Sequence, residues 1–403
     1  MEIRSITLFC DPDFSTDKAS AFFAGASGEV LPLPLQTRRL ALPPFPDWWE
    51  RSQPATAQAQ ALAAHWREAG ADYVSVGPVQ LRHDASWLEL LPRLLGQDDM
   101  LFASAEVAST VGDLDPRRCL GVARVIRQAS DLLDNGFGNL YFTALANCPA
   151  GSPFFPVAYH GGGDPAFAFA VEAADLAVRA FEAATTLDEA RKRLISAIER
   201  EASVLTQSAR KLADTHGLTF GGIDFSLAPF PEEARSLGRA MELLGLPSVG
   251  APGSLFAAAF ITEALDAARF PRCGFSGLML PVLEDAILAA RVAQGRLSLS
   301  DLLSYCAVCG VGLDTIPLPG AVSEEALAGI LLDVAALATR LDKPLTARLM
   351  PLPGLAAGDD VDFDFPYFAS SRVMALLDEG LFTPLRDGAR LTMASLNTPR
   401  NES

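Results

Sequence analysis

Residues 302–319 read LLSYCAVCGVGLDTIPLP, and the fold prediction is built outward from this stretch. A helical pattern leads into two cysteines, Cys306 and Cys309. A glycine-punctuated apolar run follows and ends at the acidic residue Asp314. Reactive side chains therefore occur where glycine allows the backbone to pack closely. We expect the rest of the chain to build a cavity around this segment.

The composition indicates a folded, acidic protein. The chain has 403 residues and half of them are hydrophobic, which is enough for a large core. Lys and Arg total 32, Asp and Glu total 49, and the formal net charge is −17. Such a charge repels phosphate backbones, so we expect no nucleic-acid partner. Anionic small molecules stay possible, because a local arginine or a helix N-terminus can overcome the global field.

The cysteine pattern and the apolar runs favour a cytoplasmic protein with reduced thiols. Six cysteines in 403 residues are too sparse for a disulfide framework. No charged start leads into a long apolar run, and the longest apolar stretch, 255–270, contains three charged residues. We therefore expect no membrane association. The acidic surface and the wide apolar helices are compatible with a homo-oligomer.

Strand patterns alternate with helix patterns along the chain, as in α/β proteins with a mainly parallel sheet. The proline-rich segment 31–46 predicts an extended connection or sheet edge. We expect one α/β domain over 1–392 and a disordered tail over 393–403. The predicted strands include 3–9, 72–79, 139–147, 218–224 and 344–350. The predicted helices include 55–69, 116–133, 166–184, 187–216, 255–270 and 323–341.

Five phrases, in order along the chain, resemble the domain-of-unknown-function family 711. The resemblance implies a ten-stranded α/β barrel like that of glycyl-radical enzymes and ribonucleotide reductases. In that fold a hairpin-like loop carries a cysteine to the barrel centre, and by analogy the Cys309 loop takes that place here. The family brings no agreed activity with it. The phrases are FFP with YH at 154–160, GIDFS at 222–226, LMLPVLED at 278–285, AVCGVGLD at 307–314 and KPLTAR at 343–348.

The chain departs from the radical enzymes at its C-terminal end. Those enzymes store a radical on a glycine in a loop of the Arg-Val-x-Gly-Tyr kind, and residues 391–403 contain no glycine. We therefore expect no radical mechanism.

The C-x-x-C pair at Cys306 and Cys309 fits neither of its common uses. A structural zinc site needs a second close pair of ligands, which the sequence lacks. Thioredoxin-like chemistry places the pair at a helix N-terminus, whereas here a helix pattern precedes it. Cys306 reads as a small buried hydrophobe. For Cys309 two interpretations are left: the same structural role, or the role of a nucleophile.

Three acids follow apolar strands and are candidates for acid–base catalysis or for binding a divalent metal ion. They are Asp224, Glu284 and Asp314, and each has a competing interpretation as a helix cap or strand-end residue. His160 is one of four histidines, and it suits proton transfer at neutral pH. An incidental histidine in a glycine loop is the alternative.

The remaining candidates are polar or flexible positions that bind substrate. Arg348 lies inside an apolar strand and needs a partner, which is either one of the acids or a substrate carboxylate. No G-x-x-x-x-G-K-[ST] or G-x-G-x-x-G motif in a suitable context occurs, so no nucleotide cofactor is expected. The other candidate substrate-binding residues are Gly161, Gly162, Ser226, Ser254 and Asp285.

These observations lead to three hypotheses of function. The first is an enzyme that performs hydrolysis or group transfer at an acyl-type carbon of a small polar metabolite. Cys309 is then nucleophile or acid–base, supported by His160 and the three acids. The second replaces the thiol by a divalent metal ion on Asp224, Glu284 and Asp314. The third is a non-catalytic, regulatory protein that binds a small molecule.

Overall fold

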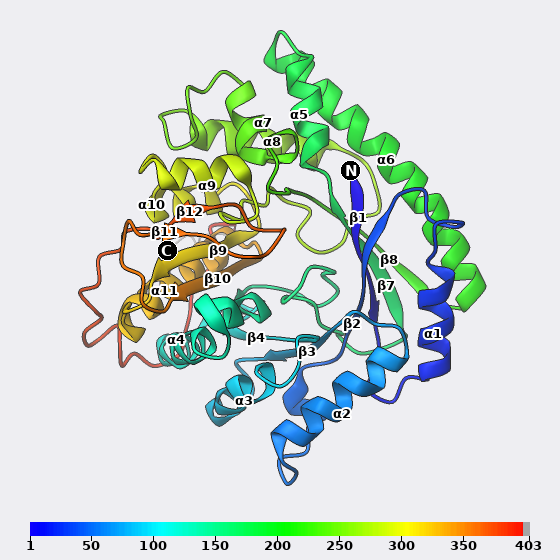
Figure 1. Ribbon diagram of the computed structural model, residues 1–403, viewed down its shortest axis with the longest axis vertical. Helices are drawn as coiled ribbons and strands as arrows, with labels where there is room; N and C mark the ends of the chain where they lie inside the picture. Colours follow the sequence, from blue (N-terminus) through cyan, green and yellow to red (C-terminus); the bar gives the residue numbers. More distant parts are fainter. Residues whose placement is uncertain (398–403) are drawn as a thin grey trace, which may run out of the picture.

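The computed structural model describes residues 1–397 and shows a mixed α/β fold around one curved sheet (Figure 1). Nine strands form its main path in the order β8-β7-β1-β2-β3-β4-β6-β10-β9, and β5 and β13 complete eleven strands beside β4. The strands of the main path are β1 (Glu2–Phe9), β2 (Leu35–Ala41), β3 (Tyr73–Val79), β4 (Leu101–Ala108), β6 (Phe142–Ala146), β7 (Ala166–Glu172), β8 (Thr219–Ala228), β9 (Gly312–Pro319) and β10 (Leu345–Leu352). The short strands are β5 (Asp113–Leu114) and β13 (Leu391–Thr392), and a separate hairpin pairs β11 (Asp360–Val361) with β12 (Ser371–Arg372).

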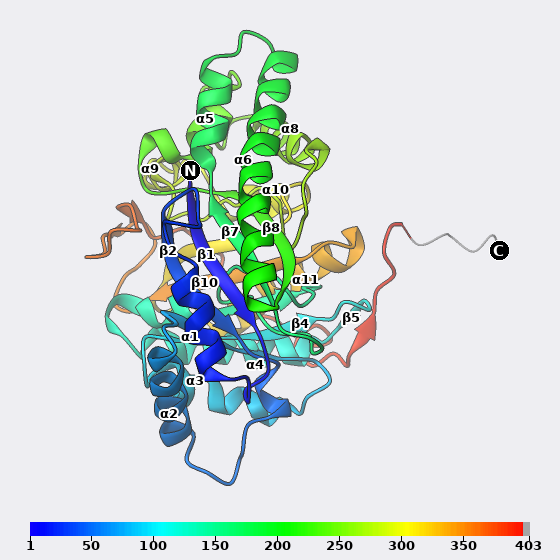
Figure 2. The ribbon, with the colours of Figure 1, turned by 90° about the vertical axis from the view of Figure 1, so that its right-hand side faces the viewer.

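The helices lie on the outer, convex side of the sheet (Figure 1), and the largest apolar core lies between the helices and the sheet. Figure 2 shows the longest helix, α6, running along this side beside β8. The helices are α1 (Thr16–Gly25), α2 (Ala55–Glu68), α3 (Leu91–Leu95), α4 (Pro116–Ser130), α5 (Ala174–Glu182), α6 (Leu187–His216), α7 (Leu237–Leu243), α8 (Ser254–Ala267), α9 (Ala286–Ala293), α10 (Leu299–Cys306) and α11 (Glu324–Leu341).

The prediction of a ten-stranded closed barrel is corrected by the strand pairing. The sheet has eleven strands, and its main path ends at β8 and β9 without a regular strand between them. The segment 278–282 lies there instead: Met279 N–H donates to the Ser226 carbonyl, and Val282 N–H donates to the Asp314 carbonyl. Pro281 has no N–H to donate, so this segment makes isolated bridges rather than a ladder.

A loop over residues 147–163 fills part of the concave side of the sheet. The Ser5 and Thr7 hydroxyls, on β1, donate to the Pro153 carbonyl, and the Ser75 hydroxyl, on β3, donates to the Ala158 carbonyl. Neighbouring phenylalanines of the loop, 154 and 155, pack on two different groups of inward-facing sheet residues. The resemblance placed the Cys309 loop here, but the structure does not.

Cys309 lies in a short turn between α10 and β9. Its side chain belongs to the large core between helices and sheet, not to the clusters on the concave side.

Two predicted elements differ from the structure. Residues 166–184, expected as one helix, contain strand β7 followed by helix α5, because alanines and phenylalanines over 166–171 are buried on both faces. A run buried on both faces has no alternating pattern that would separate it from a buried helix. The proline-rich segment 31–46 holds an interior strand, β2, between its prolines. Both differences place more strands next to β1 than the pattern indicated.

The C-terminal part of the described chain is held by backbone hydrogen bonds. Within the predicted tail 393–403, Met393 N–H donates to the Gly112 carbonyl and Leu396 N–H donates to the Arg340 carbonyl. Residues 398–403 lie outside the described residues. Over residues 1–397, no helix combines the length and the apolar character needed to cross a membrane.

Candidate functional site

A cavity lies on the concave side of the sheet, between the inner strands, the loop 147–163 and the segment 363–368. The cavity has a volume of about 100 Å³, which leaves room for a small molecule. Its walls are largely aromatic, with a few charged groups. The charged residues among its lining are Arg4, Arg39, Glu284, Asp314 and Arg348, and the aromatic ones are Tyr73, Phe102, Phe154, Phe155, Phe275, Phe365 and Tyr367.

Three of the predicted site residues meet in one ion-pair network at the wall of this cavity. Arg348, on β10, donates from Nη2 to Glu284 Oε1 at 2.7 Å and from Nε to Asp314 Oδ1 at 2.5 Å. Arg4, on β1, donates from Nη2 to the second oxygen of Glu284 at 2.7 Å and from Nη1 to Glu172 at 3.3 Å. The predicted salt bridge of Arg348 with an acid is therefore confirmed.

The backbone of β9 is distorted where it presents Asp314 to the cavity. The register between β9 and β10 shifts between Ala347 and Leu349, and Thr315 adopts a positive φ of 46°. A β-branched residue rarely occupies this left-handed region, which costs about 1–3 kcal/mol. Such bulges turn a side chain out of the regular alternation, and here Asp314 and Val311 both line the cavity.

Asp314 combines a buried environment with an unused oxygen. Burial raises the pKa of its carboxyl above the ordinary value, and the adjacent Arg348 cation opposes that rise. Within residues 1–397, Oδ1 accepts the Arg348 bond and Oδ2 accepts none. The carboxyl thus retains an acceptor toward the cavity, which Glu284 lacks because an arginine occupies each of its oxygens.

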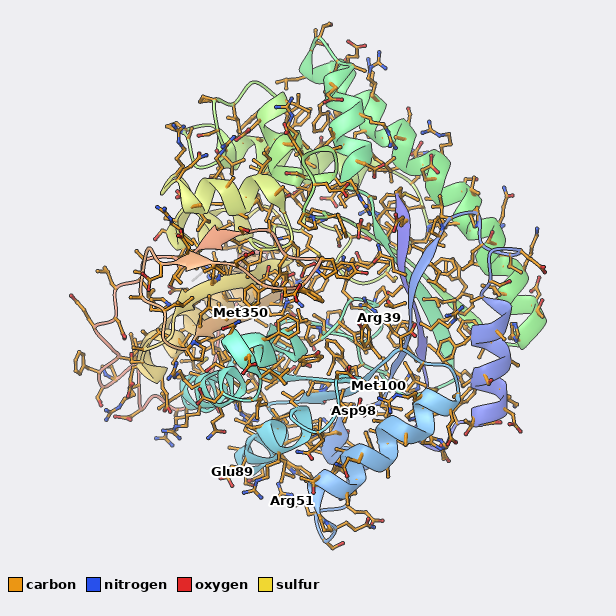
Figure 3. The ribbon with its side chains drawn as sticks, viewed as in Figure 1. Arg39, Arg51, Glu89, Asp98, Met100 and Met350 are labelled. Atoms are coloured by element: carbon orange, nitrogen blue, oxygen red, sulfur yellow. The ribbon has the colours of Figure 1, made fainter. Side chains whose placement is uncertain are left out.

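Arg39, on β2, is the cation that the sequence reading missed. Its Nε donates to the Thr37 hydroxyl at 2.9 Å, and in the described part of the chain its two terminal nitrogens have no hydrogen bond and no carboxylate partner. The side chain lies near the rings of Phe155 and Tyr73, with its central carbon 5.1 and 5.7 Å from their centroids. Figure 3 shows Arg39 on the inner side of β2, toward the middle of the molecule.

The environment of Arg39 is costly for a cation. The residue is only 7% exposed, and burial together with the nearby Arg4 cation lowers the pKa of its guanidinium to about 9. A buried charge without a partner is disfavoured by several kcal/mol. Two aromatic faces return about 1–2 kcal/mol each. The terminal nitrogens of this guanidinium are therefore able to donate to an anion in the cavity.

Asp224 and Ser226, both predicted site residues, serve as a structural clamp away from the cavity. Asp224 accepts hydrogen bonds from the backbone N–H groups of Phe275 at 2.7 Å and Ser276 at 2.9 Å, and from the Ser226 hydroxyl. Its side chain is fully buried, and burial raises the pKa of the carboxyl to about 6. The clamp fixes the turn that presents Phe275 to the cavity.

Two further predicted binding residues are helix-terminus residues. Asp285 caps α9 and also accepts from the Ser236 hydroxyl and two backbone N–H groups at the start of α7. Ser254 opens α8 and accepts from Gly250 N–H. The capping interpretation therefore accounts for Asp285 fully, and neither side chain lines the cavity.

His160 lies near the residues that follow β1 and β2, where its backbone N–H donates to the Leu42 carbonyl. His160 is buried, its Nε2 has no hydrogen bond, and Asp11 Oδ1 lies 4.0 Å away. Gly161 and Gly162 are exposed. None of the three lines the cavity, so the structure separates them from Asp314 and Arg348.

The two cysteines form a buried thiol pair. Cys306 and Cys309 are 1% and 2% exposed. A hydrogen bond from Cys306, together with the backbone N–H groups of Gly312 and Val311, lowers the pKa of the Cys309 thiol to about 6 against the effect of burial. Gly312 itself has φ 108° and passes so close to Thr346 that a Cβ would clash with its backbone. Cys309 therefore packs behind the cavity wall and does not line it.

The predicted metal site of three acids is not assembled. Among residues 1–397, no group of three His, Cys, Asp or Glu side chains is placed to hold a metal ion. Glu284 and Asp314 are neighbours, but arginines occupy them, and Asp224 is committed to its clamp.

The fold and the site are thus a curved α/β sheet with a cavity on its concave side, and three arginines are among the residues that line this cavity. The chain belongs to the family described as uncharacterised ACR (DUF711), whose model matches residues 1–370. This finding confirms the family resemblance seen in the sequence.

The chain is similar to several proteins named UPF0210 protein. The chain is 34% identical over 289 residues to one from Pyrobaculum arsenaticum, a match that covers 70% of this chain and 63% of that protein. It is 32% identical over 318 residues to one from Methanopyrus kandleri, with 75% and 70% covered. A protein from Pelobacter propionicus is 28% identical, with 97% of this chain and 94% of the relative covered. The match to the Pyrobaculum protein thus spans less than two thirds of that relative's length.

Proposed function

We propose that the protein is an enzyme that binds a small anionic metabolite in the cavity and transfers a proton through Asp314. The observation that carries this proposal is Arg39, a buried guanidinium whose two terminal nitrogens have no partner within residues 1–397. An unpaired buried cation lowers the stability of the fold, and a neutral residue of the same shape would be more stable at this position. A ligand anion that pairs with Arg39 would offset this cost.

The proton-transfer role of Asp314 rests on its position and its free oxygen. A general acid or base must reach the ligand, and its pKa must lie nearer to neutrality than that of an ordinary carboxyl. Asp314 lines the cavity, keeps Oδ2 unbonded in the described chain, and has a pKa raised by burial. Hydrolysis and group transfer, the reactions expected from the sequence, both need such a group.

Arg348 and Glu284 support this role by holding Asp314 in place, because their side chains are bound to each other and to neighbouring charged groups. Arg348 fixes one oxygen of Asp314 and is itself fixed by Glu284, so the carboxyl has one orientation. The distorted backbone at Thr315 adds to that positioning. Positioning of this kind is what a catalytic carboxyl needs, and a protein that only binds its ligand gains nothing from it.

The test compares variants in a screen of small anions. Wild type, Arg39→Met and Arg67→Met are melted with each anion, Arg67 being an exposed arginine on α2 outside the cavity. We expect at least one anion to raise the melting temperature of wild type and Arg67→Met but not of Arg39→Met. Mass spectrometry of that anion after incubation then shows whether it is converted. Conversion that stops in Asp314→Asn, with binding retained, supports the enzyme; binding without conversion favours the non-catalytic protein.

A further inference from the structure

The charges around the cavity indicate how much negative charge the ligand carries. Arg348 is bound to both Glu284 and Asp314, and Arg4 is bound to Glu284 and Glu172, so these two cations are neutralised. Arg39 alone, among the cations that line the cavity, has no acidic partner in the described chain. The wall thus has one positive charge to offer.

The rest of the described lining offers no free cation for a second negative charge, because Arg4 and Arg348 are both paired with carboxylates. Asp314 and Glu284 line the same cavity as Arg39, and three strands, β3, β4 and β6, separate β2 from β10 along the sheet. A phosphate monoester carries nearly two charges at neutral pH and needs several donors to satisfy its oxygens. The described lining provides one free guanidinium fork facing two carboxylates.

The free part of Arg39 has the geometry that matches a carboxylate. Its Nε is used by Thr37, which leaves the pair of terminal nitrogens. Two N–H groups in a planar fork bind the two oxygens of a carboxylate in parallel. The rings of Tyr73 and Phe155 hold the guanidinium and leave little freedom to rearrange around a tetrahedral anion.

The other walls fit a flat apolar body. Phe102 contacts the rings of Tyr73 and Phe155, with centroids 5.1 and 5.3 Å apart, so the wall beside Arg39 is a continuous aromatic surface. Phe365 and Tyr367 cover another side from the C-terminal segment, with centroids 5.2 Å apart. Aromatic rings prefer to meet other flat, unsaturated groups by offset or edge contacts.

We infer that the ligand of this site is a monocarboxylate with a flat, unsaturated or aromatic hydrocarbon body, and that phosphate esters are rejected. The inference rests on the proposed function, because it assigns the ligand class of the same cavity. The carboxylate pairs with the Arg39 fork, the body lies against the aromatic surface, and the far end of the ligand reaches Asp314.

Titration calorimetry tests this with acetate, which has no ring, and with three matched probes: benzoate, phenyl phosphate and benzamide. They share a ring and differ in charge and head-group shape. We expect benzoate to bind wild type in the millimolar range or tighter, and phenyl phosphate and benzamide to bind at least about tenfold more weakly. Arg39→Met should lose benzoate binding by a similar factor, and Arg67→Met should keep it.

Each contrary result has a defined meaning. Phenyl phosphate binding as tightly as benzoate, with dependence on Arg39, overturns the carboxylate class but leaves the anion-binding function intact. Benzoate binding that Arg39→Met does not weaken overturns both. Absence of benzoate binding at millimolar concentration, while acetate binds in an Arg39-dependent manner, overturns the aromatic body alone. No Arg39-dependent binding of any probe overturns the inference and the proposed function together.

Discussion

Arg348 Nη2 lies 2.7 Å from Glu284 Oε1, and the same guanidinium holds Asp314 through Nε. Replacement of Arg348 by Met leaves two buried carboxylates short of a cation. We expect the free energy of unfolding to fall by roughly 3–5 kcal/mol, the usual cost of breaking a buried pair from one side. Urea titration followed by circular dichroism measures it.

The matched control is Arg372→Met, which removes an arginine that is half exposed and paired with Asp360. An exposed pair contributes about 0–1 kcal/mol, so this variant should melt close to wild type. Equal losses in the two variants would contradict the structural role given to Arg348.

For Arg39, the second buried arginine of the cavity, we expect the opposite effect of substitution on stability. Arg39→Met removes an unpaired cation whose desolvation costs several kcal/mol, against aromatic contacts that return less. We expect the ligand-free variant to match or exceed the stability of wild type. A loss above about 2 kcal/mol in the same urea titration would show that Arg39 is structural, and the case for an anion site would fail.

The sequence could predict the acid–arginine network but not the unpaired arginine. Glu284 and Asp314 were found because they follow apolar strands, and Arg348 because a charge inside an apolar strand needs a partner. Arg39 has the same signal, since Thr37 and Arg39 share one face of β2. The prolines of segment 31–46 obscured that strand. Whether a given arginine finds a carboxylate depends on which strands become neighbours across the sheet, and local pattern does not contain this.

The same limit explains the remaining differences. Asp224 was predicted as a catalytic acid and Asp285 as a substrate-binding residue, because a carboxyl after a strand has the same sequence signature whether it faces a ligand or backbone N–H groups. The loop 147–163 is positioned against β1 and β3 by contacts between residues more than 70 positions apart in the chain, such as Ser75 with Ala158, and local pattern does not contain them. The strand-like segment 278–282 makes isolated bridges and single hydrogen bonds instead of a ladder, and its sequence pattern does not reveal this.

Asp224 gives a prediction of pH dependence. Its pKa is about 6 in the folded protein against an ordinary 3.8, so the folded state favours the protonated form. The stabilisation is complete below the unfolded pKa and is lost as the pH rises through about 6. A shift of about two units corresponds to roughly 3 kcal/mol. The unfolding free energy of wild type minus that of Asp224→Asn should therefore decrease by about this amount between about pH 4 and pH 7.

The difference between the two proteins isolates Asp224, because every other titrating group is common to both. The steric and hydrogen-bonding cost of the Asn amide is independent of pH and cancels in the slope. A difference that stays constant over this range would mean that the three hydrogen bonds to the carboxylate balance the effect of its burial, and the raised pKa of Asp224 would be wrong.

Substitution of Cys309 distinguishes the proposed mechanism, in which Asp314 transfers a proton, from a mechanism in which a thiol reacts. Its lowered pKa of about 6 suits a nucleophile, but the side chain is 2% exposed and does not line the cavity. We expect Cys309→Ala to keep benzoate binding within about twofold and to cost roughly 1 kcal/mol of stability by the small void it leaves. Cys306→Ala, on the other thiol of the pair, is the control and should behave alike. If Cys309→Ala alone abolishes conversion of the ligand while Cys306→Ala converts it normally, the thiol takes part in the reaction and Asp314 does not act alone.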